Sequence, residues 1–271
     1  MRLFAFGCSF TNYAWPTWAT IMAYDLQIPI YNFAIAGLGN RGIMNRIVEA
    51  DAKFNIQPED KIVILWSSFE RWDHIHDGEY QATGSIFAHG REMKWLQDRW
   101  NYPEDLVFNY SEIITVNRAW KDNIFWQGMA FDPHIGDGGA YIKSLDLLAG
   151  KKFEELYKDK LPKLPICIEF DEQGNAWNGL LDDLHPDVIG HMNLLEKYMY
   201  RDLDLQLRPE TKVIFQELHV DLEKEYKKPE NVTNLFGDTV GNATLRCLRA
   251  KYRKSIYPYV GSWSLSDDIV Y

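Results

Sequence analysis

The stretch Lys61-Ile62-Val63-Ile64-Leu65-Trp66 is a continuous apolar run that is rich in β-branched residues. A strand that is covered on both faces needs such a run, because neither face meets water. Two shorter β-type runs precede it, at Leu3–Phe6 and at residues 28–33, and residues at helical spacing follow each of them. Three β-α units at the start of the chain predict a parallel sheet.

Small residues follow all three expected strands. Gly7-Cys8-Ser9 comes after the first, Ala36-Gly37-Leu38-Gly39-Asn40 after the second and Ser67-Ser68 after the third. Parallel sheets place their ligand sites at the carboxyl ends of the strands. We therefore expect the functional site at this edge of the sheet.

The periodic pattern loosens after the third unit. Residues 77–160 mix aromatic, charged and glycine residues, which predicts an aromatic-rich helical insertion with helices near 106–126 and 141–157. A strand is expected at 166–170 and a helix at 186–200. The main domain should span residues 1–205, and residues 206–271, with a strand-like run at 212–215, should form a C-terminal extension that packs on the core.

Composition excludes several classes of protein. The 271 residues are 46% hydrophobic, which excludes disorder, and a net charge of −10 argues against nucleic acid as a partner. A basic stretch at 246–254 is best explained as a solvated helix face. Three cysteines fit a reducing compartment, and neither a signal peptide nor an apolar run of about 18 residues is present, so we expect a cytoplasmic protein without a membrane span.

Ser9, in Gly7-Cys8-Ser9-Phe10-Thr11, stands where a strand ends and a helix is about to begin. A serine there exposes its hydroxyl at the sheet edge and points its own N–H into the same space, so it supplies a nucleophile and one oxyanion donor. Helix capping is the alternative role for this serine. Cys8 is a weaker candidate nucleophile, because neighbouring residues on a strand point to opposite sides.

A second motif, Asp182-Asp183-Leu184-His185-Pro186, enters the expected helix at 186–200. The carboxylate of Asp182, three residues before His185, can reach the imidazole Nδ1 and leave Nε2 free. This is the orienting acid and base that a nucleophilic serine needs. A capping aspartate and a surface histidine are the alternative for this motif alone, but the two motifs together are a much stronger signal.

These motifs resemble the GDSL-type, or SGNH, serine hydrolases. Residues 7–11 are similar to block I of that family, Gly37 is similar to the glycine that follows its second strand, and Asp182, His185 and Pro186 match its Asp-x-x-His-Pro block. The resemblance covers about residues 1–76 and 180–200. It implies a three-layer α/β/α sandwich with a parallel five-stranded sheet, the flavodoxin-like fold of the family, and an esterase that needs no cofactor.

The resemblance also implies roles for single residues. Ser9 is the expected nucleophile, His185 the base and Asp182 its orienting carboxylate, and the N–H groups of Ser9 and Gly37 form the oxyanion hole. Block I here has Cys8 where the family usually has aspartate.

Block III differs more from the family pattern. The family has Gly-x-Asn-Asp after its third strand, whereas this chain has Trp66-Ser67-Ser68-Phe69, so the oxyanion asparagine has no counterpart. Ser68 takes its place by position, and its hydroxyl can donate the missing hydrogen bond. Asn40, Ser67 and Arg71 are further candidates for substrate contacts, and an ion pair with Glu70 or Asp73 is the alternative for Arg71.

The sequence thus predicts a serine esterase for a carboxylic ester, and the aromatic insertion favours an O-acetyl group on a carbohydrate. One alternative is an SGNH-fold binding or scaffold protein for a glycan or a protein, and a second is acyl transfer by the same residues. Ser9 and His185 within hydrogen-bond reach, in a cleft open to solvent, would indicate the enzyme, whereas a buried or blocked serine would count against the esterase. Residues 73–77 and 132–137 are rich in acidic and histidine side chains but lack a recognised metal spacing, so we expect no metal site.

Overall fold

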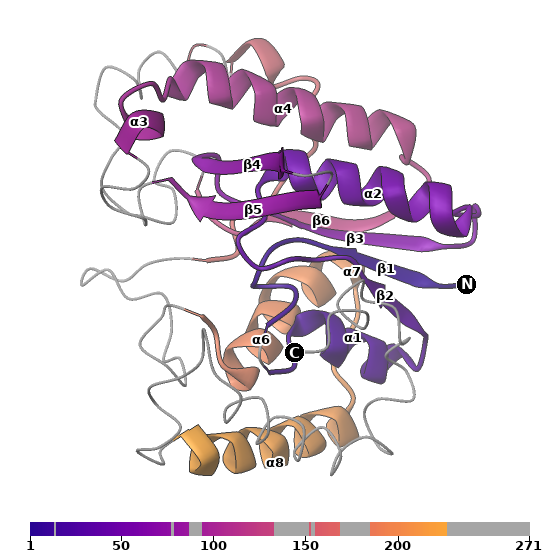
Figure 1. Cartoon of the computed structure of the whole chain (residues 1–271). Coiled ribbons are helices and arrows are strands. Elements are labelled where there is room, and N and C mark those ends of the chain that lie inside the picture. The colour runs from indigo at the N-terminus through magenta and orange to yellow at the C-terminus, as the bar shows by residue number, and fades with distance from the viewer. Residues whose placement is uncertain are drawn as a thin grey trace. The chain divides into compact units, whose positions relative to one another are not determined.

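The computed structural model of the chain describes residues 1–13, 15–76, 79–86, 94–132, 152, 155–168 and 185–226 (Figure 1). These residues form a mixed α/β fold with a parallel sheet in the strand order β2-β1-β3-β6. The sheet strands are β1 (Leu3–Phe6), β2 (Ile30–Asn32), β3 (Lys61–Trp66) and β6 (Ile124–Met129). The predicted parallel sheet is therefore confirmed for four strands.

The chain divides into two compact units. Unit 1 comprises Met1–Ala5, Phe10–Phe33 and Phe170–Tyr271, and unit 2 comprises Phe6–Ser9 and Ala34–Glu169. Each unit is described by itself below. No helix within the described residues is both long enough and apolar enough to cross a membrane.

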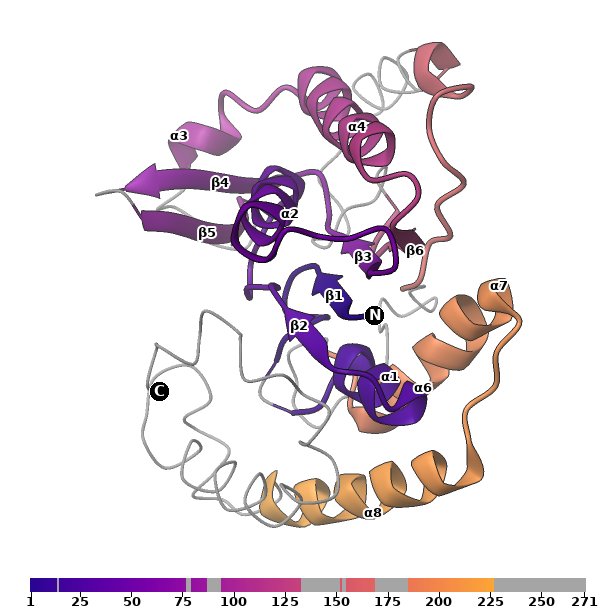
Figure 2. The same ribbon diagram turned by 90° about the vertical axis from the view of Figure 1, so that its right-hand side faces the viewer.

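Unit 1 pairs β1 with β2 in parallel, with Leu3 opposite Ile30. Its helical elements are α1 (Trp18–Leu26), α6 (Val188–Leu194), the π-helical stretch η2 (Leu195–Tyr200), α7 (Arg201–Leu203) and α8 (Pro209–Tyr226). Helices α1, α6 and α8 contact one another (Figure 2). Helix α8 is thus packed on α1 and α6 within unit 1, and the division of the chain at residue 205 stays a prediction.

The expected strand-like run at 212–215 is wrong, because these residues lie inside α8. The buried side chains of α8 follow the helical period, and they are Thr211, Phe215, Leu218 and Leu222. Pro209 at the first position of the helix also suits this start, since its missing N–H would have no partner in the first turn. The four-residue apolar run was too short to distinguish a strand from one turn of a helix.

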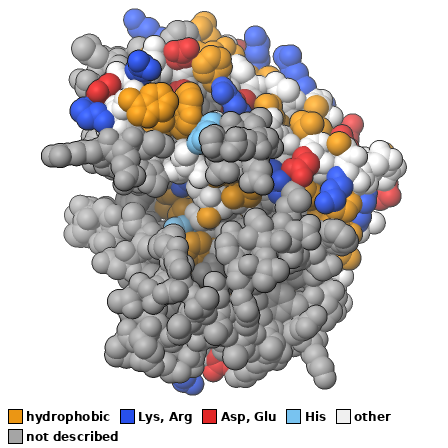
Figure 3. All heavy atoms as spheres, viewed as in Figure 1, with side chains coloured by type: hydrophobic (Ala, Val, Ile, Leu, Met, Phe, Trp, Pro, Cys, Tyr) orange, Lys and Arg blue, Asp and Glu red, His pale blue; other side chains and the backbone are white. Residues whose placement is uncertain are grey.

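Unit 2 pairs β3 with β6 in parallel, with Val63 opposite Trp126. Its helices are α2 (Asn40–Phe54), α3 (Lys94–Gln97) and α4 (Tyr102–Ala119), and α2 packs on α4. The strands β4 (Arg71–His76) and β5 (Glu79–Ser85) form a separate antiparallel hairpin. Unit 2 also exposes large aromatic side chains, at 40% for Trp72 and 55% for Trp95, and Figure 3 shows hydrophobic side chains gathered near α3.

The range 77–160, expected to be an insertion, contains a strand of the main sheet. Strand β6 pairs directly with β3, and α4 precedes it where a helix was expected to continue to residue 126. Gln127 and Gly128 interrupt the apolar run of this strand, which explains why its sequence did not predict it. After β6, Ile166 forms a parallel bridge with Met129 where a strand was expected at 166–170.

Candidate active site

Ser9 belongs to unit 2 and follows the end of β1. It is 5% exposed, so the expected exposed hydroxyl is not observed. Its neighbours explain this burial, since Cys8 is fully buried and Phe10 is 3% exposed, which makes the turn part of the hydrophobic core. Cys8 is a free thiol.

Gly37 adopts a left-handed backbone conformation, with φ at +80°. A side chain there would be strained, and a Cβ would lie 3.2 Å from the backbone nitrogen of Gly84 in β5. The same Gly84 nitrogen donates a hydrogen bond of 3.0 Å to the Gly37 carbonyl. The turn thus requires glycine for its own geometry, and the role of the Gly37 N–H in an oxyanion hole stays a prediction.

Asn40 is the first residue of α2 and is 2% exposed. Its Oδ1 accepts a hydrogen bond of 2.7 Å from the Ser67 N–H. Its Nδ2 donates to the Ser67 carbonyl at 3.1 Å and to Asn109 Oδ1 at 2.7 Å. Because both amide hydrogens have acceptors, Asn40 fastens the start of α2 to the residue that follows β3, and a substrate contact would replace one of these bonds.

The two serines after β3 differ in their hydrogen bonds. Ser67 is fully buried, and its Oγ has no hydrogen-bond partner among the described residues. The Oγ of Ser68 accepts a hydrogen bond of 3.2 Å from Arg71 Nε. A guanidinium has only donors, so the hydroxyl hydrogen of Ser68 is left to donate elsewhere. This arrangement suits the predicted donor role of Ser68.

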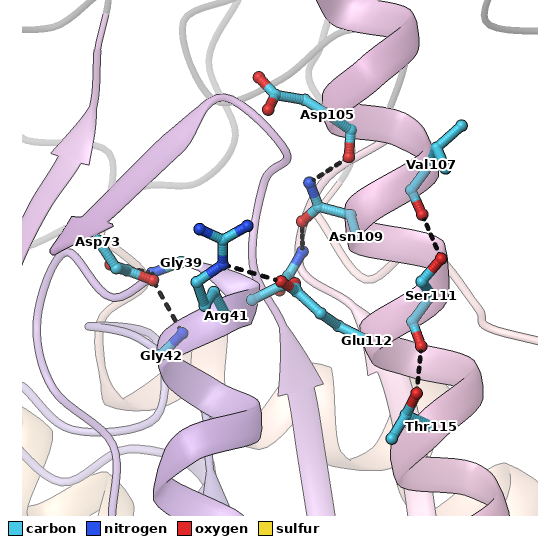
Figure 4. Close-up of polar contacts among 11 residues, drawn as sticks. Gly39, Arg41, Gly42, Asp73, Asp105, Val107, Asn109, Ser111, Glu112 and Thr115 are labelled. Atoms are coloured by element: carbon cyan, nitrogen blue, oxygen red, sulfur yellow. Dashed lines mark hydrogen bonds and ion pairs between the residues drawn. The ribbon is translucent and has the colours of Figure 1, made fainter.

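Asp73, on β4, caps helix α2 from a distant part of the chain (Figure 4). Its carboxylate accepts hydrogen bonds from the N–H groups of Gly39, at 2.9 and 3.0 Å, and of Gly42, at 2.9 Å. Burial raises the pKa of Asp73, while the two backbone hydrogen bonds act in the opposite direction. The positive end of α2 is therefore occupied by a carboxylate of the protein itself. The sequence did not predict this role.

A second group of polar side chains lies between α2 and α4 (Figure 4). Asp105, Asn109 and Glu112 recur at helical spacing on α4, and Arg41 Nε of α2 is 3.2 Å from Glu112 Oε1. Burial raises the pKa of Glu112 to about 7 and that of Asp105 to about 6. Both carboxyl groups therefore lose their protons at a higher pH than an ordinary carboxyl group, and the spacing 105, 109, 112 was the signal that sequence reasoning missed.

His185 belongs to unit 1 and is half-buried, just before Pro186 and α6. The Tyr13 ring stacks on its imidazole with 4.0 Å between centroids and 11° between planes. The Phe10 ring also stacks on it, at 5.1 Å and 26°. Trp15 Nε1 donates a hydrogen bond of 2.8 Å to the Pro186 carbonyl. Three aromatic residues that follow Ser9 in the sequence thus contact the His185-Pro186 dipeptide.

Two further histidines lie in the helices of unit 1. His191, on α6, is 1% exposed, and burial together with the charge of His185 lowers its pKa to about 3. His219, on α8, places Nδ1 3.8 Å from Asp187 Oδ2. No group of three or more His, Cys, Asp or Glu side chains within the described ranges is arranged to hold a metal ion.

Several expected residues lie outside the described ranges. They are Asp182, His134, Asp137 and the basic stretch at 246–254. Ser9 belongs to unit 2 and His185 to unit 1, so the triad stays a prediction. No protein-family model matches the chain, and no curated protein matches it either. The resemblance to SGNH hydrolases therefore rests on the sequence motifs.

Proposed function

We propose that the chain is a serine esterase of the SGNH type, with Ser9 as nucleophile, His185 as base and Asp182 as its orienting carboxylate. The observation that carries this proposal is the stacking of Phe10 on His185, with 5.1 Å between ring centroids. Phe10 directly follows Ser9, and consecutive Cα atoms are about 3.8 Å apart. One peptide bond thus links the serine to a residue that contacts the base, which supports a Ser9–His185 pair.

We also infer the five-stranded, three-layer fold of that family. The parallel bridge between Met129 and Ile166 supports a fifth strand beside β6. Two further hydrogen bonds continue it, from Cys167 N to the Met129 carbonyl at 2.9 Å and from Ile168 N to the Ala130 carbonyl at 3.0 Å. A parallel strand at this position extends the observed order β2-β1-β3-β6 by one.

In the proposed reaction, Ser9 Oγ attacks the ester carbonyl while His185 Nε2 takes its proton. The carbonyl π electrons move onto the oxygen of a tetrahedral intermediate. When that intermediate collapses, the bond to the leaving alcohol breaks and His185 protonates the alcohol. Water then attacks the acyl-serine with His185 again as base, and the products are a carboxylic acid and the regenerated Ser9.

In this proposal, the N–H groups of Ser9 and Gly37 and the Ser68 hydroxyl donate hydrogen bonds that stabilise the oxyanion. The Arg71 Nε donor, 3.2 Å from Ser68 Oγ, supports the last assignment because it leaves the Ser68 hydrogen available. Loss of one oxyanion donor lowers kcat by about 10²–10³ in a well-studied protease. A hydroxyl in place of the usual asparagine therefore predicts a slower but measurable turnover.

We propose an O-acetylated carbohydrate as the substrate class. Exposed indole rings support it, because flat rigid rings pack well against sugar faces, and Trp72 and Trp95 of unit 2 are 40% and 55% exposed. Acyl transfer to a second alcohol would use the same residues as hydrolysis. Measuring acid and ester products separately distinguishes the two reactions.

A binding protein that recognises a glycan or a protein is the second candidate function. The burial of Ser9 favours it, since an ester carbonyl has to reach the Oγ of a residue that is only 5% exposed. The absence of the block III asparagine points in the same direction.

Release of p-nitrophenol from p-nitrophenyl acetate tests the proposal on the full chain. We expect Ser9→Ala and His185→Gln to lower turnover by about 10³-fold or more. Ser111→Ala is the matched control, because the Ser111 hydroxyl donates to the Val107 carbonyl within α4 (Figure 4). A folded wild type with no more activity than Ser9→Ala, and no labelling of Ser9 by a fluorophosphonate, would overturn the esterase proposal and favour the second candidate.

A further inference from the structure

The Tyr13 ring stacks face to face on the His185 imidazole. Its ring centroid is 4.0 Å from that of His185, and the two planes are within 11° of parallel. Rotation about χ2 of His185 would tilt the imidazole out of this parallel arrangement. The stack therefore opposes the rotation that changes the direction of both ring nitrogens.

Tyr13 is itself held in place by neighbouring groups of unit 1. The Trp15 ring packs edge-on against it, at 4.7 Å and 77°. The Trp15 indole is 3% exposed and is anchored by its hydrogen bond to the Pro186 carbonyl. Just before Tyr13, the Thr11 carbonyl accepts hydrogen bonds from Thr17 Oγ1 at 2.6 Å and from Asn32 Nδ2 at 2.8 Å. These contacts thus hold the backbone and the neighbouring ring on either side of Tyr13 in place.

We propose that Tyr13 is a positioning residue that holds the His185 imidazole in the orientation in which it takes the proton of Ser9. This inference rests on the proposed function. In the proposed reaction His185 transfers the proton of Ser9 and does not hold the substrate. The contact therefore acts on the transition state more than on substrate binding.

The expected signature is a split between kcat and KM. Replacing Tyr13 by leucine keeps an apolar side chain but removes the flat ring, so we expect kcat for p-nitrophenyl acetate to fall about tenfold or more with an unchanged KM. Tyr13→Phe keeps the ring and should restore kcat. In ¹H NMR, the His185 Cε1 proton, assigned by its loss in His185→Gln, should move downfield in Tyr13→Leu as the ring current is removed.

Tyr31→Leu is the matched control. Tyr31 lies in unit 1, and it too stacks on a ring, that of Phe4, at 5.2 Å and 21°. The control makes the same substitution at a stacked tyrosine of the same unit. We expect it to leave kcat, KM and the His185 resonance unchanged. Circular dichroism checks the fold of each variant, and Tyr13→Met provides a second ring deletion with a flexible side chain should Tyr13→Leu not fold.

The outcomes distinguish a failure of the positioning role of Tyr13 from a failure of the proposed esterase function. Full kcat in a folded Tyr13→Leu or Tyr13→Met variant overturns the positioning role and leaves the esterase intact. A rise in KM at constant kcat also overturns it, since Tyr13 would then contact substrate. A wild type whose turnover equals that of Ser9→Ala overturns the proposed function, and the positioning role falls with it.

Discussion

The hydroxyl of Tyr200 in η2 donates a hydrogen bond of 2.8 Å to the carboxylate of Asp25 in α1. Asp25 is 5% exposed and also accepts hydrogen bonds from Thr211 Oγ1 at 2.6 Å and from the Arg208 N–H at 3.0 Å. One buried carboxylate therefore fastens α1, η2 and the first turn of α8 within unit 1. This network holds the start of α8 against α1 and η2.

The Asp25 network predicts that replacing Asp25 lowers the free energy of unfolding by a large amount. Asp25→Ala leaves the buried hydroxyls of Tyr200 and Thr211 without their acceptor, so we expect a loss of about 3–5 kcal/mol in the free energy of unfolding. Tyr200→Phe, which removes one hydrogen bond, should cost about 1–2 kcal/mol. Urea unfolding measures both, with Asp202→Ala as an exposed control whose pair with Arg201 should contribute less than about 1 kcal/mol. Equal midpoints for Asp25→Ala and Asp202→Ala would show that the network does not stabilise the fold.

The pKa of His191 predicts an acid-sensitive stability. Burial lowers it to about 3, whereas a histidine in an unfolded chain has a pKa of about 6.5. As the pH falls from 6.5 towards 3, the unfolded chain binds a proton that the folded protein does not, so the free energy of unfolding decreases, by about 2 kcal/mol at pH 5. This contribution is fully present above pH 6.5.

Urea unfolding at pH 7.5 and pH 5 measures this effect. His191→Gln should show a smaller decrease between the two pH values than the wild type, because glutamine does not titrate. His74→Gln is the control, since His74 is exposed on β4 and should keep the full decrease. An unaltered pH dependence in His191→Gln would assign the acid sensitivity to other groups.

The features that the sequence predicted are those that depend on local patterns. The run Lys61–Trp66 is a strand with the expected bounds, because a continuous β-branched run has few alternatives. Asp73 could not be predicted in this way, since it caps a helix whose N-cap residue, Gly39, lies 34 residues earlier in the sequence. Strand β6 was missed because its pairing with β3, and not its own composition, makes it a strand.

In the candidate site, too, the sequence predicted the residues of local motifs but not the contacts that tertiary packing creates. Ser9 and His185 were identified from motifs, but the burial of Ser9 depends on how the core closes over its turn. The contacts of Tyr13 and Phe10 with His185 join residues that are more than 170 positions apart. No spacing in the sequence reports such a contact, because it is created by tertiary packing.

Glu112 of unit 2 predicts a free energy of unfolding that decreases as the pH rises, whereas His191 predicts a decrease as the pH falls. Burial raises its pKa from 4.5 to about 7, so between these values the folded protein binds a proton that the unfolded chain does not. The free energy of unfolding therefore decreases as the pH rises through this window. Glu112→Gln should stabilise the protein by about 1–3 kcal/mol at pH 8 relative to the wild type, with little effect at pH 4.5. Arg41, whose side chain is 52% exposed, offsets only part of the burial cost.

Urea midpoints at pH 4.5 and pH 8 test this prediction. Glu217→Gln on α8 is the control, since Glu217 is exposed and should show no stabilisation at either pH. Destabilisation of Glu112→Gln by the same amount at both pH values would mean that the ion pair with Arg41 outweighs the cost of burial.

The hydrogen bonds of Asn40 predict that its replacement lowers both the stability of the protein and kcat. Asn40→Ala removes three hydrogen bonds and leaves the buried N–H and carbonyl of Ser67 without these partners, so we expect a loss of about 2–4 kcal/mol. Ser68 follows Ser67 directly, and a shift of this backbone displaces the proposed oxyanion donor. We therefore expect the kcat for p-nitrophenyl acetate to fall about tenfold or more, measured well below the thermal midpoint.

Asn117→Ala separates this positional effect from a general loss of stability. Asn117, on α4, also makes three hydrogen bonds through its amide, to the Ile113 carbonyl at 3.0 Å and to Gln127 of β6 at 3.1 and 2.7 Å. It thus ties a helix to a strand of unit 2 in the same manner, but at a different place in the fold. We expect Asn117→Ala to lower the urea midpoint by a comparable amount and to retain wild-type kcat. Equal losses of kcat in the two variants would show that turnover follows the stability of unit 2, and that the Asn40–Ser67 contact has no particular role in the site.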